Sequence, residues 1–195
     1  MSEIQQNHLG SQPYILKKTI VMVGMMGAGK TAVGRALAAR LGVPFVDSDA
    51  AIEAAARRTV PEIFERDGEP FFRAKETQVI SRLLDEAQGV LSTGGGAFLS
   101  QINRENISNR GVSVWLNASL SLLWQRVRHK ETRPLLRTAN PRATLAEIYE
   151  ARVPLYALAD VAVVSEPDLS IEDMVDRVIN TLLADRPDVL EKRNA

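Results

Sequence analysis

The chain of 195 residues contains no cysteine, which excludes disulfide bonds and metal sites built on thiolates. Its N-terminus lacks the basic and apolar run of a secretory signal, and no apolar stretch approaches the roughly 20 residues that a membrane-spanning helix needs. Positive charge is not in excess, because 24 lysines and arginines balance 24 aspartates and glutamates. The protein therefore has no net positive field that would bind a polyanion such as DNA. We expect a cytoplasmic protein that binds neither nucleic acid nor membrane, with a monomer as the default.

Short runs of apolar, β-branched residues alternate with stretches of helical periodicity along most of the chain. With 45% hydrophobic and 25% charged residues, the composition is that of one globular domain with a sizeable core. The alternation predicts a three-layer α/β/α fold in which helices pack on a central five-stranded parallel sheet. The predicted strands are 19–23, 44–47, 89–92, 113–116 and 161–164.

The apolar spacing at 72–84 and 120–127 predicts amphipathic helices. Between 130 and 141 the pattern breaks into charged residues around Pro134, a segment too polar for the core and too long for a tight turn. We interpret it as a mobile lid. The ends of the chain are polar or charged and are expected to be loosely ordered. The predicted division is an N-terminal tail at 1–18, a single domain at 19–184 and a C-terminal tail at 185–195.

The strongest motif follows the first predicted strand directly and opens an alanine-rich helical stretch. At 24–31 it reads GMMGAGKT, the pattern of a phosphate-binding loop. Its glycines let backbone N–H groups curl around phosphate oxygens, Lys30 neutralises the β- and γ-phosphates, and Thr31 offers its hydroxyl to Mg²⁺. The competing interpretation is a glycine-rich turn whose lysine is merely solvated. We favour a nucleotide site formed by Gly27, Ala28, Gly29, Lys30, Thr31 and Ala32.

Two carboxylates follow the second predicted strand, at the sheet edge where open α/β folds bind ligands. Asp47 and Asp49 are two residues apart, so both face one cleft if the extended conformation persists that far. Asp49 is the candidate to accept the hydrogen bond or the proton of an acceptor hydroxyl, and Asp47 is the candidate to hold Mg²⁺ through water. For Asp49 taken alone, an N-cap of the following helix is an equally good explanation.

Three glycines, Gly94, Gly95 and Gly96, follow the third predicted strand, where many P-loop enzymes carry an acidic residue for the metal. The absence of that acid leaves Asp47 to fill the role. Consecutive glycines cost conformational entropy, but they let a substrate approach the backbone and use its N–H groups. A flexible loop is the alternative explanation.

Two arginines lie on helical stretches where a charge needs a partner. Arg152 shares the apolar stripe of its helix with Ile148, and Arg73 has Glu76 three residues further on to fix its guanidinium. Taken singly, each is more often a surface salt-bridge partner than a ligand. Together they predict bidentate binding of a planar carboxylate, for which a lysine would serve poorly. The substrate should therefore be an anion.

Two further arginines, Arg133 and Arg137, lie in the predicted lid. Once the lid closes, they can reach the transferring phosphoryl group, stabilise its charge and exclude water that would hydrolyse ATP. Solvated loop charge is the competing interpretation.

Over roughly 20–183 the sequence resembles the shikimate kinases, in several motifs that appear in that family's order. The similar motifs are the ATP loop at 24–31, the DxD motif at 47–49, the substrate-domain signature at 67–73, the glycine triplet at 94–96, the lid motif RPLL at 133–136 and the substrate motif RVPLY at 152–156.

The resemblance implies a P-loop NTPase fold with a lid and a helical substrate-binding region at about 48–86. It also implies that the chain phosphorylates shikimate to shikimate 3-phosphate with ATP, accompanied by Mg²⁺. We do not identify the segment that covers adenine near 165–167. The implied shikimate contacts are Asp49, Arg73, Gly95 and Arg152, the residues around Mg²⁺ are Thr31 and Asp47, and the ATP contacts include Arg126 beside adenine and Arg133 at the phosphates.

Two other functions share part of this pattern. A gluconate or other sugar-acid kinase has the same fold class and also needs arginines for a carboxylate, but the glycine triplet and the motif at 152–156 disfavour it. A non-catalytic regulator with a kinase-like domain usually needs an attached DNA-binding or partner module, and only a short polar tail is present.

Overall fold

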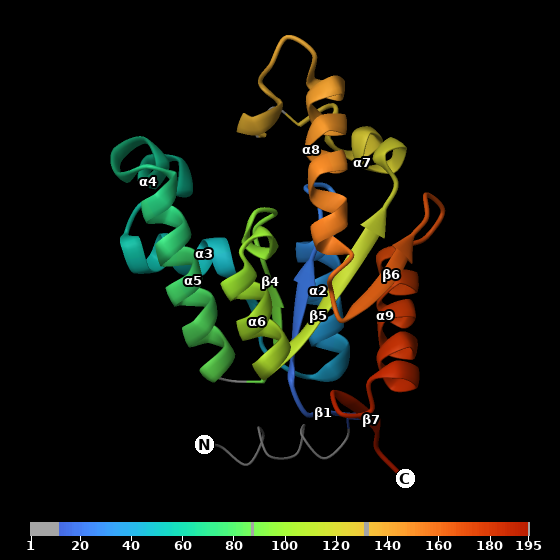
Figure 1. Ribbon diagram of the computed structural model, residues 1–195. Helices are drawn as coiled ribbons and strands as arrows, with labels where there is room; N and C mark the ends of the chain where they lie inside the picture. Colours follow the sequence, from blue (N-terminus) through green and yellow to red (C-terminus); the bar gives the residue numbers. More distant parts are fainter. Residues whose placement is uncertain (1–11, 87, 131–132, 195) are drawn as a thin grey trace.

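A computed structural model describes residues 12–86, 88–130 and 133–194. Its centre is a five-stranded parallel sheet in the order β3-β4-β2-β5-β6 (Figure 1). The middle strand, β2, is buried along its whole length, as expected of a strand covered on both faces. The five predicted strands are confirmed. Their bounds are β2 (Thr19–Val23), β3 (Phe45–Asp47), β4 (Val90–Ser92), β5 (Gly111–Ala118) and β6 (Val161–Ser165).

Helices cover both faces of the sheet, which makes the expected three-layer arrangement (Figure 1). α2 (Lys30–Leu41) packs against α9 (Ile171–Asp185), while α5 (Glu69–Asp85) packs against α6 (Gln101–Arg110). The predicted helix at 72–84 is thus confirmed, with one more turn at its start. No described helix combines the length and the apolarity that crossing a membrane requires.

A group of three helices lies within the predicted substrate-binding region. α3 (Ser48–Ala56) and α4 (Val60–Asp67) both pack against α5. Thr59 begins α4 with a capping box, because its side chain accepts from the amide of Glu62 and the Glu62 carboxylate accepts from the amide of Thr59. The sequence predicts Asp47 and Asp49 on one side of an extended chain. β3 ends at Asp47 and α3 starts directly after it, so the extended conformation does not reach Asp49.

The remaining helices lie at the carboxyl edge of the sheet, where the strands end (Figure 1). The helix predicted at 120–127 is confirmed as α7. The predicted lid at 130–141 contains a short 3₁₀ helix, η2, while residues 131 and 132 lie outside the described residues, and the mobility of the lid stays a prediction. The bounds are η1 (Ala97–Leu99), α7 (Leu120–Val127), η2 (Pro134–Leu136) and α8 (Pro141–Tyr156).

The expectation of two loosely ordered tails is wrong for part of each tail. β1 (Tyr14–Leu16) pairs antiparallel with β7 (Leu190–Lys192), and the amide of Lys17 donates to the carbonyl of Val189 at 2.7 Å. Val189 and Leu190 are fully buried, and this apolar anchor orders a charged segment. The sequence did not predict this strand pairing, because two apolar residues among many charged ones give no periodic pattern. Residues 1–11 of the predicted N-terminal tail lie outside the described residues.

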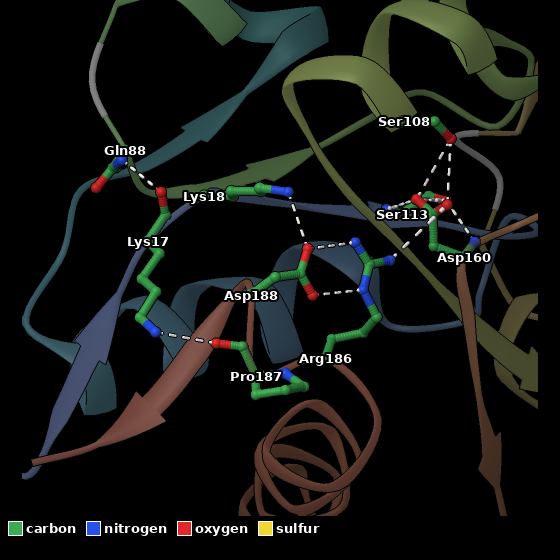
Figure 2. A network of polar contacts seen from close by, with 9 residues as sticks. All are labelled: Lys17, Lys18, Gln88, Ser108, Ser113, Asp160, Arg186, Pro187 and Asp188. Atoms are coloured by element: carbon green, nitrogen blue, oxygen red, sulfur yellow. Dashed lines mark hydrogen bonds and ion pairs between the residues drawn. The ribbon is translucent and has the colours of Figure 1, made fainter.

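A set of polar contacts, here called the amino-edge network, joins these ends to the amino edge of the sheet (Figure 2). Asp160 accepts hydrogen bonds from the amide and hydroxyl of Ser113 at 2.8 and 3.0 Å, and its own amide donates to the Ser113 hydroxyl at 2.8 Å. Asp188 binds the guanidinium of Arg186 twice at 2.8 Å and the ammonium of Lys18 at 2.8 Å. Arg186 also lies 3.9 Å from Asp160, so the network joins Lys18 and Asp188 to the amino ends of β5 and β6.

Candidate active site

The loop at 24–31 runs from the end of β2 to the start of α2. Its glycines Gly24, Gly27 and Gly29 have φ angles of 142°, 81° and 93°, which residues with a side chain rarely adopt. A Cβ atom on Gly27 would also lie 2.6 Å from the Cγ1 atom of Val127 in α7. The loop thus needs glycine both for its curl and for its close approach to α7.

Lys30 is the first residue of α2 and folds back over the loop. Its ammonium donates to the carbonyls of Gly24 and Met25 at 2.7 and 2.9 Å. Burial lowers the pKa of Lys30 to about 8, and the positive charge of Arg133 acts in the same direction. An anionic phosphate would favour the charged ammonium, so this lysine suits the role predicted for it.

The loop forms one wall of a cavity of about 550 Å³. The predicted nucleotide and metal residues meet there with the lid residue Arg133, although they come from distant parts of the sequence. Arg73 and Arg152 do not line this cavity and instead reach the glycine triplet beside it. Among the lining residues are Gly27, Ala28, Gly29, Lys30, Thr31, Ala32, Asp47, Asp49, Gly94, Gly95, Arg126 and Arg133.

The two aspartates after β3 have different local roles. Asp47 is the N-cap of α3, because its Oδ1 accepts from the amide of Ala50 at 3.1 Å. The alternative that Asp49 is the N-cap is therefore wrong, since the helix begins one residue before it. Asp49 lies in the first turn, and its Oδ1 is buried with no hydrogen-bond partner among the described residues. Burial raises the pKa of Asp49, and the negative charge of Asp47 adds to this.

The residues predicted to surround Mg²⁺ are close to each other. The hydroxyl of Thr31 donates to Oδ2 of Asp47 at 3.4 Å. No group of three or more His, Asp or Glu side chains able to hold a metal occurs in the described part of the chain. A pair of oxygen ligands nevertheless fits Mg²⁺, which keeps several waters and takes further oxygens from the phosphates of a nucleotide.

Each glycine of the triplet at 94–96 faces a different charged side chain. A Cβ atom on Gly94 would lie 2.9 Å from Oδ1 of Asp49, and one on Gly95 would lie 3.2 Å from a guanidinium nitrogen of Arg152. A Cβ atom on Gly96 would lie 2.5 Å from the guanidinium of Arg73. The triplet therefore brings together the three side chains predicted to bind the substrate, and its glycines leave the space that those side chains fill.

Arg73 is fixed by carboxylates of its own helix, as predicted. Its guanidinium donates to Glu76 at 2.9 Å, and Glu69 lies 3.3 Å from its Nε atom. Only 1% of Glu76 is exposed, and burial raises its pKa while the adjacent Arg73 opposes that shift. The buried carboxylate leaves the guanidinium little freedom beside Gly96.

Arg126 and Arg133 line the same cavity as the nucleotide loop. Arg126 donates to the carbonyls of Gly27 and Ala28 at 3.2 and 3.3 Å and to the hydroxyl of Ser165 at 3.4 Å. Nε of Arg133 is buried and has no hydrogen-bond partner within the described ranges. Arg137, the other predicted lid arginine, lines a neighbouring hollow of about 310 Å³ that Arg133 also borders.

Sequence reasoning missed several residues that line the cavity. They lie on the loop after β6 and on the first turn of α9, where the sequence carries apolar residues without a known motif. The only signal was position, because the carboxyl ends of parallel strands gather ligand-binding loops. The missed lining residues are Leu169, Ser170, Ile171 and Met174, with Ser165 at the end of β6, while Lys130, which also lines the cavity, lies at the start of the predicted lid.

Comparison with known proteins identifies the group to which this arrangement belongs. The family described as "Shikimate kinase" matches residues 26–183. The chain belongs to the shikimate kinase family. It is 66% identical to the shikimate kinase of Ruegeria pomeroyi, over 98% of this chain and 99% of that protein. It is 65% identical to that of Cereibacter sphaeroides, over 90% of this chain and 87% of that protein.

Solved structures support the same assignment. Shikimate kinase from Acinetobacter baumannii, in complex with shikimate, has a TM-score of 0.80 and 39% identity, covering 87% of this chain and 94% of that one. A gluconokinase from Sinorhizobium meliloti has a TM-score of 0.58 at 22% identity, covering 87% of this chain and 93% of that one. The second likeness concerns the fold alone. The predicted shikimate kinase resemblance is thus confirmed, and the sugar-acid kinase alternative shares only the architecture.

Proposed function

We propose that this member of the shikimate kinase family transfers the γ-phosphate of ATP to the 3-hydroxyl of shikimate, yielding shikimate 3-phosphate and ADP. This is a step of the shikimate pathway, which leads to chorismate and the aromatic amino acids. The observation that carries the proposal is the glycine triplet, which places Asp49, Arg73 and Arg152 together beside the nucleotide loop. A carboxylate acceptor and a phosphate donor can therefore occupy adjacent spaces.

The nucleotide phosphates bind in the loop at 24–31, with Lys30 on the β- and γ-phosphates. Binding exchanges the bonds of Lys30 to two loop carbonyls for bonds to phosphate oxygens. Thr31 and Asp47 would hold Mg²⁺, which offsets charge on the β- and γ-phosphates. Arg126 lies beside the adenine, and the apolar residues missed by sequence reasoning, such as Leu169 and Met174, supply a surface for the base.

The substrate carboxylate binds between the guanidinium groups of Arg73 and Arg152. Both side chains reach the triplet, and Arg73 is held by the buried Glu76. Bidentate contact with a fixed guanidinium orients the sugar-like ring as well as binding it. The 3-hydroxyl then points to Asp49, whose buried oxygen accepts its hydrogen bond.

Catalysis follows mainly from positioning and charge. Phosphoryl transfer has a loose transition state, so the protein mostly aligns the hydroxyl with the γ-phosphorus and stabilises the equatorial oxygens. Lys30 and Arg133 provide that positive charge, and the unpartnered Nε of Arg133 suits a phosphate oxygen. The hydroxyl proton passes to Asp49 or is held by it as the new P–O bond forms.

A coupled assay of ADP release tests the proposed function. We expect MgATP turnover to require shikimate and not to respond to gluconate, and we expect Lys30→Ala to abolish it without unfolding the chain. Binding of shikimate without ADP release would instead indicate a regulator, and equal turnover with gluconate would indicate a broader sugar-acid kinase. We also propose that the protein acts as a monomer in the cytoplasm, which size-exclusion chromatography and cell fractionation would check.

A further inference from the structure

Helix α8 contacts Gly95 at two points one turn apart. A guanidinium nitrogen of Arg152 lies 3.2 Å from the position of a Cβ atom on Gly95, and the hydroxyl of Tyr156, the last residue of α8, donates a hydrogen bond to the Gly95 carbonyl. Arg152 is the residue proposed to bind the substrate. Tyr156 is fully buried and does not line the nucleotide cavity, and its hydroxyl also accepts a hydrogen bond from the side chain of Arg152.

The three carbonyls of the triplet are held in different ways. The Gly94 carbonyl accepts from the amide of Ala97 at 3.1 Å, and the Gly96 carbonyl accepts from the amide of Leu99 at 3.2 Å. Both bonds belong to the turn into η1 and form wherever that turn forms. The Gly95 carbonyl is instead held by a side chain from a distant helix, so its orientation depends on Tyr156.

The ring of Tyr156 is itself fixed from two sides. It stacks on Phe98 of η1 at 6.5 Å between ring centroids, and on Trp115 of β5 at 6.3 Å. Trp115 also lies against the nucleotide loop, because a Cβ atom on Gly24 would be 3.3 Å from its Cδ1 atom. The ring stack therefore connects the segment after the triplet to the strand beside the nucleotide loop.

We propose that Tyr156 is a positioning residue for shikimate binding, which orients the Gly95 peptide so that Arg152 and the triplet backbone meet the substrate together. The inference rests on the proposed function and extends it to a residue that contacts neither substrate. Three consecutive glycines are free to sample many backbone conformations, and one side-chain hydrogen bond at the middle residue removes much of that freedom. Burial raises the pKa of Tyr156, against the opposing effect of nearby Arg152, so the hydroxyl stays protonated as a donor.

The test is the variant Tyr156→Phe, which keeps the stacked ring and removes the hydroxyl, with its bond to Gly95 and its contact with Arg152. We expect the KM for shikimate to rise about fivefold, the effect of one lost hydrogen bond, while the KM for ATP and kcat change less than about twofold. Tyr149→Phe, the same change two turns earlier on α8, is the matched control and should leave all three constants unchanged. Titration calorimetry with shikimate alone should show the same loss of affinity.

The outcomes separate the two proposals. A wild-type protein without shikimate-dependent turnover would overturn the proposed function, whatever Tyr156 does. Wild-type turnover with an unchanged shikimate KM in Tyr156→Phe would overturn the positioning role alone, and so would equal rises in the KM values of both substrates. Assays at 10 °C guard against lost stability, and a variant that does not fold even there would show that the hydroxyl serves the fold, which also overturns the inference.

Discussion

At the amino edge of the sheet, Asp160 accepts hydrogen bonds from two serines and lies beside Arg186, whereas at the carboxyl edge Asp49 has a buried oxygen that accepts none. Both edges concentrate charged side chains around strand ends. Within the described residues, the amino-edge network leaves no buried side-chain atom without a partner, but Asp49 and Arg133 each have one.

We interpret the difference as one between polar groups that stabilise the fold and groups that we propose bind a ligand. A buried donor or acceptor without a partner costs about 1–3 kcal/mol, and folded proteins rarely retain such a group by chance. The free-energy cost of the unpartnered groups at the carboxyl edge is consistent with groups that form hydrogen bonds to a bound substrate. Substitutions at the two edges should accordingly change different quantities: kinetics at one, stability at the other.

The largest expected effect is that of Asp49→Asn. Loss of the charged acceptor should lower kcat by roughly 10²–10⁴-fold, the usual contribution of a positioned acid or base. The melting temperature should not fall, because burial disfavours the charged form of the carboxylate and an uncharged asparagine removes that cost. Steady-state kinetics and thermal melting would show both results. Glu53→Gln, one turn later on α3, is the control, since Glu53 accepts from the amide of Val60 and contacts no cavity. A variant with full kcat would exclude Asp49 from the reaction.

Arg152→Lys should have the next largest effect. A lysine keeps the charge but loses the bidentate fork, so we expect the KM for shikimate to rise roughly tenfold or more while the KM for ATP is nearly unchanged. Arg142→Lys, at the exposed start of the same helix, should change neither value. Equal effects of the two substitutions would place Arg152 outside the binding site.

A smaller effect should appear in the pH dependence of nucleotide binding. The pKa of Lys30 is about 8 in the free protein, and bound phosphates must raise it, so binding takes up a proton near this pH. Affinity for MgADP should be constant below about pH 7 and be up to roughly tenfold lower at pH 9, as the empty loop loses its ammonium charge. Calorimetry in two buffers of different ionisation enthalpy would measure the proton uptake. Affinity independent of pH over this range would contradict the assignment.

The smallest kinetic effect should come from the amino edge. Asp160→Asn weakens the bonds to Ser113 and Ser108, which should cost about 1–2 kcal/mol of unfolding free energy and leave both KM values unchanged. Asp85→Asn, which removes an exposed ion pair with Arg110, should cost less than about 1 kcal/mol. Urea unfolding followed by fluorescence would measure both. A large rise in either KM for Asp160→Asn would contradict the expectation that substitutions at the amino edge change stability and not kinetics.

The sequence predicts much of the sheet because buried parallel strands are continuous apolar runs. It also predicts the nucleotide loop, whose glycines are needed for backbone reasons that hold in any context, and the contact of Arg73 with Glu76, which lie three residues apart on one helix. Local rules therefore account for local features of both the fold and the candidate site.

The same local rules did not predict features that depend on tertiary structure. By sequence, Asp49 was equally well explained as a helix cap or as a site residue, and only the start of α3 at Ser48 shows that Asp47 is the cap. The meeting of each triplet glycine with its own charged side chain depends on three separate helices. The contact of Tyr156 with Gly95 spans 61 residues, a separation at which no periodic pattern gives information.

The pairing of β1 with β7 has a practical consequence. The register aligns Tyr14 with Lys192, so the two ends of the described chain lie side by side, on the side of the molecule opposite the carboxyl edge of the sheet (Figure 1). A surface tether, an affinity handle or a fused domain attached there would lie at the amino edge of the sheet. Shikimate and nucleotide would keep an open route to their pockets, and a short covalent bridge could join the ends into a ring.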